Sequence, residues 1–362
     1  MLQANRHGCR FTDFVSGGNR FLTVENNMIK LTFWLNKGAD LIEIRHKLKD
    51  LDVLWRSPIP MFASGTYNPP AVGSLSPFFD YYPGGWQEVF PNAHLPVSSY
   101  KNAPLGLHGE VCLLPWDYTV LENSEELVRI RFEVRTARTP FRLVKILTLK
   151  NGEPFFLFDE EIVNEGNEEM AYNWGHHPVF GAPFLEEGCV IDVPDHSVAV
   201  IPEAGSYSGS ERLAPGQRAI WPNVKTTKGE TIDISIVPGM DAGCADSFHL
   251  VVREGWAALR NPRLDLGVAL AWDLSTFPYL WIWQAYCGSP GYPFYKRNYN
   301  VALEPYSVPV ETLTESIQSG NANILQPGEK KTTRLKFGFV GGKEKVKTYK
   351  LYEHCDREQP RE

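Results

Sequence analysis

Short runs in which apolar and polar side chains alternate recur along the chain. In LVRIRFEV (127–134), every second residue from Val128 onward is apolar, and the residues between are arginine or glutamate. MIKLTFWL (28–35) alternates in the same way. Further strand-like runs are TIDISIV, FHLVVRE, VALAWDL, YLWIWQAY, NVALEPY and TTRLKFGFV. Because successive side chains of a strand point to opposite faces of a sheet, this pattern predicts β-strands.

Turn-forming residues separate these runs at short intervals. The chain contains 30 glycines and 27 prolines, which leave little room for long helices. Asn151-Gly152 lies between FRLVKILTL and PFFLFDEEIV and predicts a β-hairpin. Short strands with turn residues between them are typical of sandwiches and barrels. The sequence therefore predicts an all-β fold.

The organisation of the chain predicts one domain over residues 1–362. No internal repeat or linker-like composition divides it, and its length allows a large hydrophobic core. From about residue 343 the sequence is highly charged and predicts a polar tail, whose first part is compatible with an edge strand. Segments 60–106 and 202–222 are rich in Pro, Gly and Ser, and we expect such long loops to carry the binding surface.

Charge and hydropathy exclude several kinds of partner. The formal net charge of −7 argues against nucleic acid and anionic membranes, since both require a basic surface. No apolar stretch has the length of a membrane span, and MLQANRHGCRFTDF lacks the apolar core of a secretory signal. The six cysteines are scattered, without a CxxC pair, which is typical of reduced thiols. We therefore expect a cytoplasmic protein.

Polar residues that could carry chemistry stand among apolar residues and glycines in four stretches. These stretches are GGWQEVFPNAHL (84–95), GLHGEV (106–111), NWGHHPVFG (173–181) and NVALEPYSVP (300–309). The adjacent histidines His176 and His177 point to opposite faces if their segment is a strand. At most one of them can therefore face a given pocket.

The residues by themselves leave the roles of Glu304 and His108 open. Glu304 lies in an apolar run and is either paired, exposed to solvent or functional; exposure is the simplest interpretation at this point. His108 has a glycine close on either side, so a ligand could approach it closely, although such a histidine is commonly structural. Glu110 shares a face with His108 and could orient it or bind substrate.

Several site classes lack their sequence signature. The histidine pair has neither HExxH spacing nor a nearby cysteine, so we predict no metal site. GxSxG, a P-loop and a GxGxxG that opens a helix are also missing from the sequence. The histidines, carboxylates and ten tryptophans instead suit a pyranose, which has an apolar ring face and a rim of hydroxyls.

Taken in order, these motifs resemble the aldose 1-epimerase (galactose mutarotase-like) family over most of the chain. GLHGE resembles the family's first histidine motif, and GHHPVF resembles its H-P-x-F, with His177 in the position of the family's histidine. ADSFHLV resembles D-x-x-F, and NVALEPYSVP resembles the stretch that holds the catalytic glutamate. DVLW, GVALAWDLSTFPYLWIWQAY and ILQPGEKKTTRLKFGF resemble further strands of the family.

This resemblance implies a supersandwich of mostly antiparallel sheets with the site in a groove across one face. It also implies an enzyme that interconverts the α and β anomers of a hexose or related sugar without a cofactor. Glu304 would be the base, His177 the acid and His108 a second histidine at the ring oxygen. Asp246 would bind sugar hydroxyls, with His176 as a secondary contact.

The sequence also departs from the family pattern. The family's arginine-bearing stretch is replaced by GGWQEVFPNA, so its contact would pass to Gln87, Glu88 or Asn92, or to an arginine from elsewhere such as Arg142. Tyr306 stands where the family has glutamine. Gln284 lies on a strand that would meet the groove, and we include it with Glu110 among the candidate binding residues.

Three alternatives on the same fold remain at the sequence level. They are a hexose-6-phosphate 1-epimerase, which would need a cationic cluster; a carbohydrate-binding protein without turnover; and a lyase, which would use a Tyr or Lys base. The sequence indicates neither the sugar nor the oligomeric state.

Overall fold

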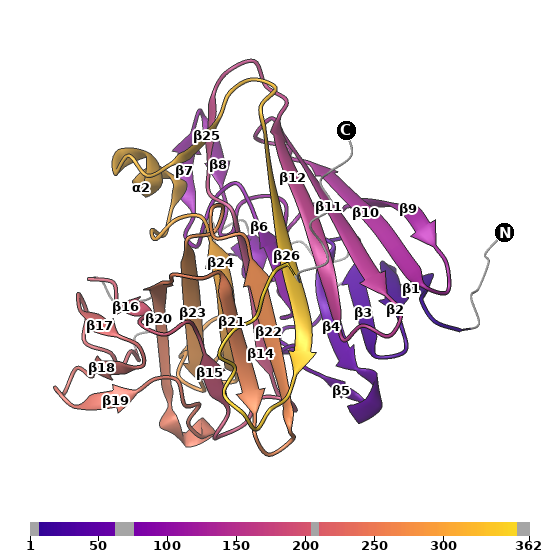
Figure 1. Cartoon of the computed structure of the whole chain (residues 1–362). Helices are drawn as coiled ribbons and strands as arrows, with labels where there is room; N and C mark the ends of the chain where they lie inside the picture. The colour runs from indigo at the N-terminus through magenta and orange to yellow at the C-terminus, as the bar shows by residue number, and fades with distance from the viewer. Residues whose placement is uncertain (1–6, 62–75, 204–209, 353–362) are drawn as a thin grey trace.

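The computed structural model describes residues 7–61, 76–203 and 210–352. Two large sheets face each other across an apolar core (Figure 1), and all strand pairs within them are antiparallel. The predicted all-β sandwich is therefore confirmed. Parts of the predicted binding loops, residues 62–75 and 204–209, lie outside the described residues.

The first sheet has twelve strands. In spatial order they are β1 (Arg10–Ser16), β2 (Asn19–Glu25), β3 (Ile29–Trp34), β4 (Asp40–His46), β6 (Trp86–Val89), β14 (Gly175–Gly181), β24 (Tyr299–Tyr306), β23 (Tyr279–Tyr286), β20 (Cys244–Val251), β16 (Val198–Val200) and β17 (Arg218–Ile220), with β5 (Leu51–Asp52) paired to β4.

The second sheet has eight strands. Their order is β15 (Val190–Asp192), β21 (Trp256–Asn261), β22 (Leu266–Trp272), β26 (Lys330–Val340), β12 (Phe155–Asn164), β11 (Phe141–Lys150), β10 (Leu127–Arg135) and β9 (Asp117–Asn123). The predicted hairpin is confirmed, because β11 and β12 flank Asn151-Gly152 and pair along their length.

Small elements complete the described chain. Three two-stranded sheets pair β7 (Val97–Tyr100) with β8 (Ala103–Leu105), β13 (Met170–Tyr172) with β25 (Asn323–Leu325), and β18 (Asn223–Lys225) with β19 (Thr231–Asp233). The helical turns are η1 (Lys47–Lys49), α1 (Ser76–Phe79), η2 (Met240–Ala242) and α2 (Leu313–Gln318).

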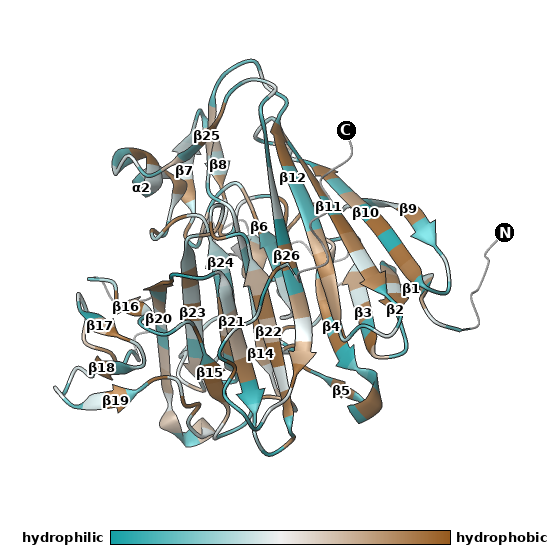
Figure 2. Ribbon diagram, viewed as in Figure 1, coloured by the Kyte–Doolittle hydropathy of each residue, from teal (hydrophilic) through white to brown (hydrophobic). Residues whose placement is uncertain are grey.

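Aromatic side chains from both sheets fill the space between them. Phe33 of β3 contacts Phe132 of β10 at 4.8 Å and Phe158 of β12 at 6.4 Å between ring centroids. All three rings are buried. The alternation read from the sequence accounts for this arrangement, because the apolar residues of β10 face the core and its charged residues face outward (Figure 2).

The interpretation of the tail as an edge strand is wrong. β26 ends at Val340, and residues 341–352 contain no strand. β26 already pairs with β22 on one side and β12 on the other, so the segment that follows it cannot pair with β26. The segment after it is bound by side chains instead: the Arg260 guanidinium donates to the carbonyl of Gly342 at 3.0 Å, and the amide of Val346 donates to Asp192 at 2.9 Å.

Replacing Phe33 with alanine tests how much the contact between the sheets stabilises the fold. We expect Phe33→Ala to lower the free energy of unfolding by about 3–5 kcal/mol, because it leaves a cavity in a close-packed core. Phe14→Ala in β1 is the matched control, since that ring is 40% exposed, and it should cost about 1 kcal/mol or less. Denaturant unfolding of both variants measures the difference; equal losses would contradict the assigned core.

Candidate active site

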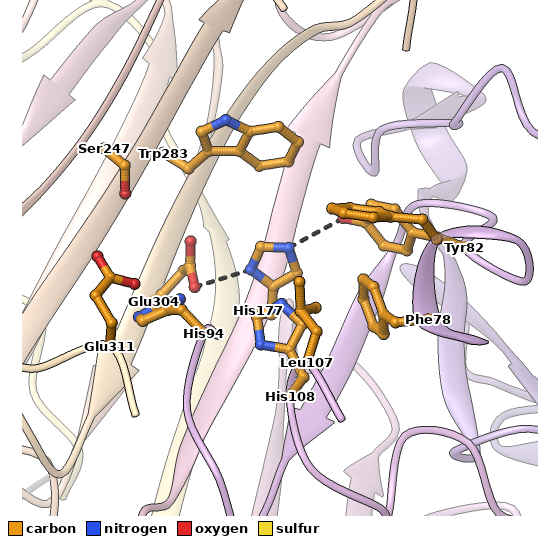
Figure 3. Close-up of a pocket in the computed structure, with 11 residues that line it drawn as sticks. Phe78, Tyr82, His94, Leu107, His108, His177, Ser247, Trp283, Glu304 and Glu311 are labelled. Atoms are coloured by element: carbon orange, nitrogen blue, oxygen red, sulfur yellow. Dashed lines mark hydrogen bonds and ion pairs between the residues drawn. The ribbon is translucent and has the colours of Figure 1, made fainter. Parts of the chain in front are cut away.

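A small cavity lies on the face of the first sheet that points away from the second sheet. Its walls come from β14, β20, β23 and β24, from the segments around α1 and before α2, and from the segments that follow β6 and β8 (Figure 3). The lining residues are Phe78, Phe79, Tyr82, His94, Leu107, His108, His177, Ser247, Trp283, Glu304 and Glu311. Three sequence-predicted site residues, Glu304, His177 and His108, are therefore brought together here.

Glu304 and His177 meet in the cavity from neighbouring strands. The register of β14 on β24 pairs Val179 with Ala302, so it places His177 opposite Glu304. Their closest atoms, Nδ1 of the histidine and Oε2 of the glutamate, are 2.8 Å apart, although the contact lacks the direction of a regular hydrogen bond. Glu304 is only 2% exposed, so its interpretation as a solvent-facing residue is wrong. Glu304 is buried because β24 lies between β14 and β23 in the sheet, and the loop residues that line the cavity cover the outer face of β24.

The other side of the His177 ring is held by aromatic groups. Its Nε2 lies 3.1 Å from the hydroxyl of Tyr82. The ring stacks against Trp283 with an interplanar angle of 18°. Both nitrogens of His177 are therefore in polar contact, one with a carboxylate and one with a phenol.

His108 enters the cavity from a tight left-handed turn. Its φ is 61°, and the following Gly109 has a φ of 79°. A Cβ at Gly109 would lie 2.3 Å from the carbonyl oxygen of Phe90, so only glycine fits there. Burial, reinforced by His177 and His94, lowers the pKa of His108 well below its usual value. The ring is therefore neutral and can donate one hydrogen bond and accept another.

Several lining residues were not among the candidates taken from the sequence. Tyr82 and His94 come from the long loop region, and Ser247 and Glu311 come from β20 and the segment before α2. Burial lowers the pKa of His94 to about 3, so this ring is also neutral. The sequence indicated Tyr82 and His94 only through the expectation that segment 60–106 forms part of the binding surface. The family motifs assigned none of these four residues a role.

His176 points away from the cavity, as alternation requires. It lies between the sheets, where Trp86 donates to its Nδ1 at 3.2 Å and its Nε2 lies 3.1 Å from Glu160. Glu88 of β6 joins this cluster, bonded to Lys145 at 3.2 Å and to the indole of Trp174 at 2.6 Å. His176 and Glu88 were expected to contact the substrate. In the structure, their side chains instead make contacts in the core between the sheets.

The ionisation of this buried cluster is shared among its members. Burial would raise the pKa of Glu88, but His176 and Lys145 lower it below its usual value. Burial and the charge of Glu88 raise the pKa of Glu160 to about 7. Ligand atoms of Glu88, Glu160 and His176 lie within 4.8 Å of one another, a spacing that suits a metal ion. The ammonium of Lys145 and the indole N–H groups already bind two of these ligand groups, Glu88 and His176.

Asp246 and Gln284 lie on the same inner face as His176. Asp246 is the neighbour of Ser247 on β20, so their side chains point to opposite faces. The carboxylate accepts from Arg212 at 2.7 Å, and Arg212 also donates to Gln284 at 2.8 Å. Neither predicted binding residue lines the cavity described above.

The remaining predicted binding residues support loops or the outer surface. Gln87 donates to Asp40 and to the carbonyl of Gly84, and Asn92 donates to the carbonyls of Leu95 and Gly106. The carboxylate of Glu110 accepts from the amides of residues 137 and 138. Arg142 lies on the outer face of β11, paired with Glu161 and Glu165. The structure thus does not bring an arginine to the cavity from this position.

Residues 16–339 match the family described as "Domain of unknown function (DUF4432)". The chain belongs to this family. A curated relative, the Uncharacterized protein C18B11.11 of Schizosaccharomyces pombe, is 27% identical over 107 residues, and the match spans 29% of this chain and 8% of the relative. In the described residues, no helix combines the length and the apolar character of a membrane span.

Solved structures show the fold more fully. A "putative aldose 1-epimerase" from Klebsiella pneumoniae has a TM-score of 0.70 at 17% identity, over 93% of this chain and 88% of that one. A galactose mutarotase related enzyme from Lactobacillus acidophilus has a TM-score of 0.59 at 18% identity, over 93% and 100%. A galactose mutarotase-like protein from Clostridium acetobutylicum has 0.60 at 12%, over 92% and 99%. The galactose mutarotase-like fold implied by the motifs is confirmed.

The buried cluster behind His177 can be tested by removing its lysine. We expect Lys145→Met to lower the free energy of unfolding by about 3–5 kcal/mol, because Glu88 then keeps a buried charge without its partner. Lys150→Met, on the exposed end of the same strand, should change it by about 0.5 kcal/mol or less. Adding Glu88→Gln to Lys145→Met should restore part of the lost free energy of unfolding, measured by denaturant unfolding. If the double variant is no more stable than Lys145→Met, the ion pair between Lys145 and Glu88 is contradicted.

Proposed function

We propose that this protein is an aldose 1-epimerase, which interconverts the α and β anomers of a sugar. The observation that carries the proposal is the buried contact of 2.8 Å between Glu304 and His177, with the neutral His108 beside them. A carboxylate and an imidazole together suit proton exchange at neutral pH. The names of the fold's solved relatives support the same class of reaction.

In the proposed reaction, the sugar binds between these groups. Glu304 takes the proton of the C1 hydroxyl while His177 gives a proton to the ring oxygen. The bond between C1 and the ring oxygen breaks, and C1 becomes an aldehyde. After rotation about the C1–C2 bond, the reverse transfers close the ring with the other configuration, so protons balance over the cycle. His108 donates a hydrogen bond to the ring oxygen or a neighbouring hydroxyl.

The lining of the cavity weighs against the phosphorylated alternative. No lysine or arginine is among the described residues that line it. Phosphate recognition depends on such cations or on backbone amides at a helix N-terminus. We therefore propose a free sugar as substrate rather than a hexose 6-phosphate.

Polarimetry tests the reaction directly. The protein should accelerate the approach of freshly dissolved α-D-glucose or α-D-galactose to anomeric equilibrium. Glu304→Gln and His177→Asn should each lower the rate above background by about 10²–10⁴-fold, since each removes one positioned proton transfer. His196→Asn, at an exposed turn, is the matched control and should retain the rate.

The variants must bind sugar and unfold like the wild type for this result to count. Full activity in Glu304→Gln would overturn the assignment of the base. Sugar binding by the wild-type protein without any acceleration would instead indicate the carbohydrate-binding alternative.

Tyr82 gives the lyase alternative one supporting observation, because a phenol lies in the cavity beside a histidine. For an epimerase, Tyr82 only orients His177, and we expect Tyr82→Phe to lower the rate of anomer exchange by about tenfold or less. For a lyase, Tyr82→Phe would abolish formation of an unsaturated product from a uronide, measured by its ultraviolet absorbance, and Glu304→Gln would have little effect. An epimerase should depend on Glu304 more than on Tyr82, and a lyase should show the reverse. Comparing Tyr82→Phe with Glu304→Gln therefore separates the two functions.

A further inference from the structure

A second carboxyl group, that of Glu311, lines the cavity beside Glu304 (Figure 3). It comes from the segment between β24 and α2. The backbone of Glu311 is fixed on both sides: its amide donates to the side chain of Glu315 at 3.1 Å, and its carbonyl accepts from the amide of Leu95 at 2.9 Å. The structure therefore holds this residue at the cavity wall by its main chain.

The side chain of Glu311 has no cationic partner in the described part of the chain. The charged or titratable groups that face it are Glu304 on β24, Glu315 on α2 and the neutral His94. Burial, together with the charges of Glu315 and Glu304, raises the pKa of Glu311 to about 7. Its carboxyl therefore lies at the cavity, and no hydrogen bond or ion pair to another described residue occupies it.

Among the described residues that line the cavity, His177 is the group that the proposed reaction protonates, and Glu304 already pairs with it, so an anionic ligand would find no unpaired counter-charge. Lys37 lies behind the aromatic wall of the cavity, with its ammonium 5.5 Å from the centroid of the Phe78 ring. That ammonium is paired with Asp40 at 2.6 Å, and Phe78 lies between it and the cavity side. A carboxylate or phosphate on a ligand would therefore be desolvated beside two glutamates without a partner, which is costly.

We propose that Glu311 determines specificity by excluding sugars that carry an anionic group. The inference rests on the proposed function and defines its substrate class as uncharged sugars. A protonated Glu311 can donate a hydrogen bond to a sugar hydroxyl, and an ionised Glu311 still accepts one, so neutral sugars are tolerated in both states. An anionic sugar meets repulsion only from the ionised form.

The sign of the pH dependence follows from this difference. As pH rises from 6 to 8, Glu311 passes from mainly protonated to mainly ionised, because its pKa is raised to about 7. Discrimination against anionic sugars should therefore increase with pH. One added charge repulsion in a partly buried site corresponds to about tenfold in affinity.

The experiment compares two pairs of sugars that differ only at C6: glucose with glucuronate, and galactose with galacturonate. Binding is measured by calorimetry and by the protein's tryptophan fluorescence at pH 6 and pH 8, and anomer exchange is followed by polarimetry. In the wild type, the neutral sugar should bind more tightly, and the affinity ratio should widen about fivefold between the two pH values, because Glu311 is mostly but not fully converted between them. Glu311→Gln should remove this widening, and the exposed Glu254→Gln should retain it.

The outcomes separate the two proposals. Equal affinity for both members of each pair, or the same widening in Glu311→Gln, would overturn the role of Glu311 even if anomer exchange is fast. Neutral sugars that bind with the expected ratios but are not turned over would leave the role of Glu311 intact and overturn only the epimerase assignment. If neither neutral sugar binds, both proposals fail together.

Discussion

The two-residue alternation of β14 is the constraint on which the rest of the site depends. This strand is buried on both faces, so each of its adjacent histidines is committed to a different environment. His177 faces Glu304 in the cavity, whereas His176 faces Glu160 between the sheets. A shift of one residue in the register would exchange them and place the wrong histidine beside the glutamate.

The polar cluster around His176 and the cavity around His177 have different roles. Between the sheets, Lys145 and the indole groups satisfy the buried charges and fix the backbone that carries His177. In the cavity, the buried Glu304 and the half-buried Glu311 lie with the neutral imidazoles of His94 and His108, and their carboxyls face the space a ligand would enter. Stability and chemistry are thus assigned to opposite faces of the same sheet.

The alternation and turn residues predicted the sandwich and the hairpin at Asn151, whereas the grouping of Glu304, His177 and His108 was predicted by the resemblance to the aldose 1-epimerase family. The resemblance also suggested Asp246 as a binding residue, and Gln284 was included because its strand would meet the groove, but neither lines the cavity. The hydrophobic pattern could not correct this, because β20 and β23 are buried on both faces and the pattern does not indicate which side chains face the cavity. Tyr82, from the long loop region, and Glu311, from the segment that follows β24, were also missed. Only the folding of these segments over the sheet brings Tyr82 beside His177 and Glu311 to the wall of the same cavity.

The size of the cavity has a consequence for how binding is measured. Its volume is about 20 Å³, enough for one water molecule but far below that of a sugar ring. Occupancy by a sugar therefore requires some of the side chains that line the cavity to move apart. The apparent dissociation constant then equals the intrinsic constant divided by the fraction of molecules whose cavity is open. A substitution in this wall can therefore change the apparent affinity even if it alters no contact with the sugar.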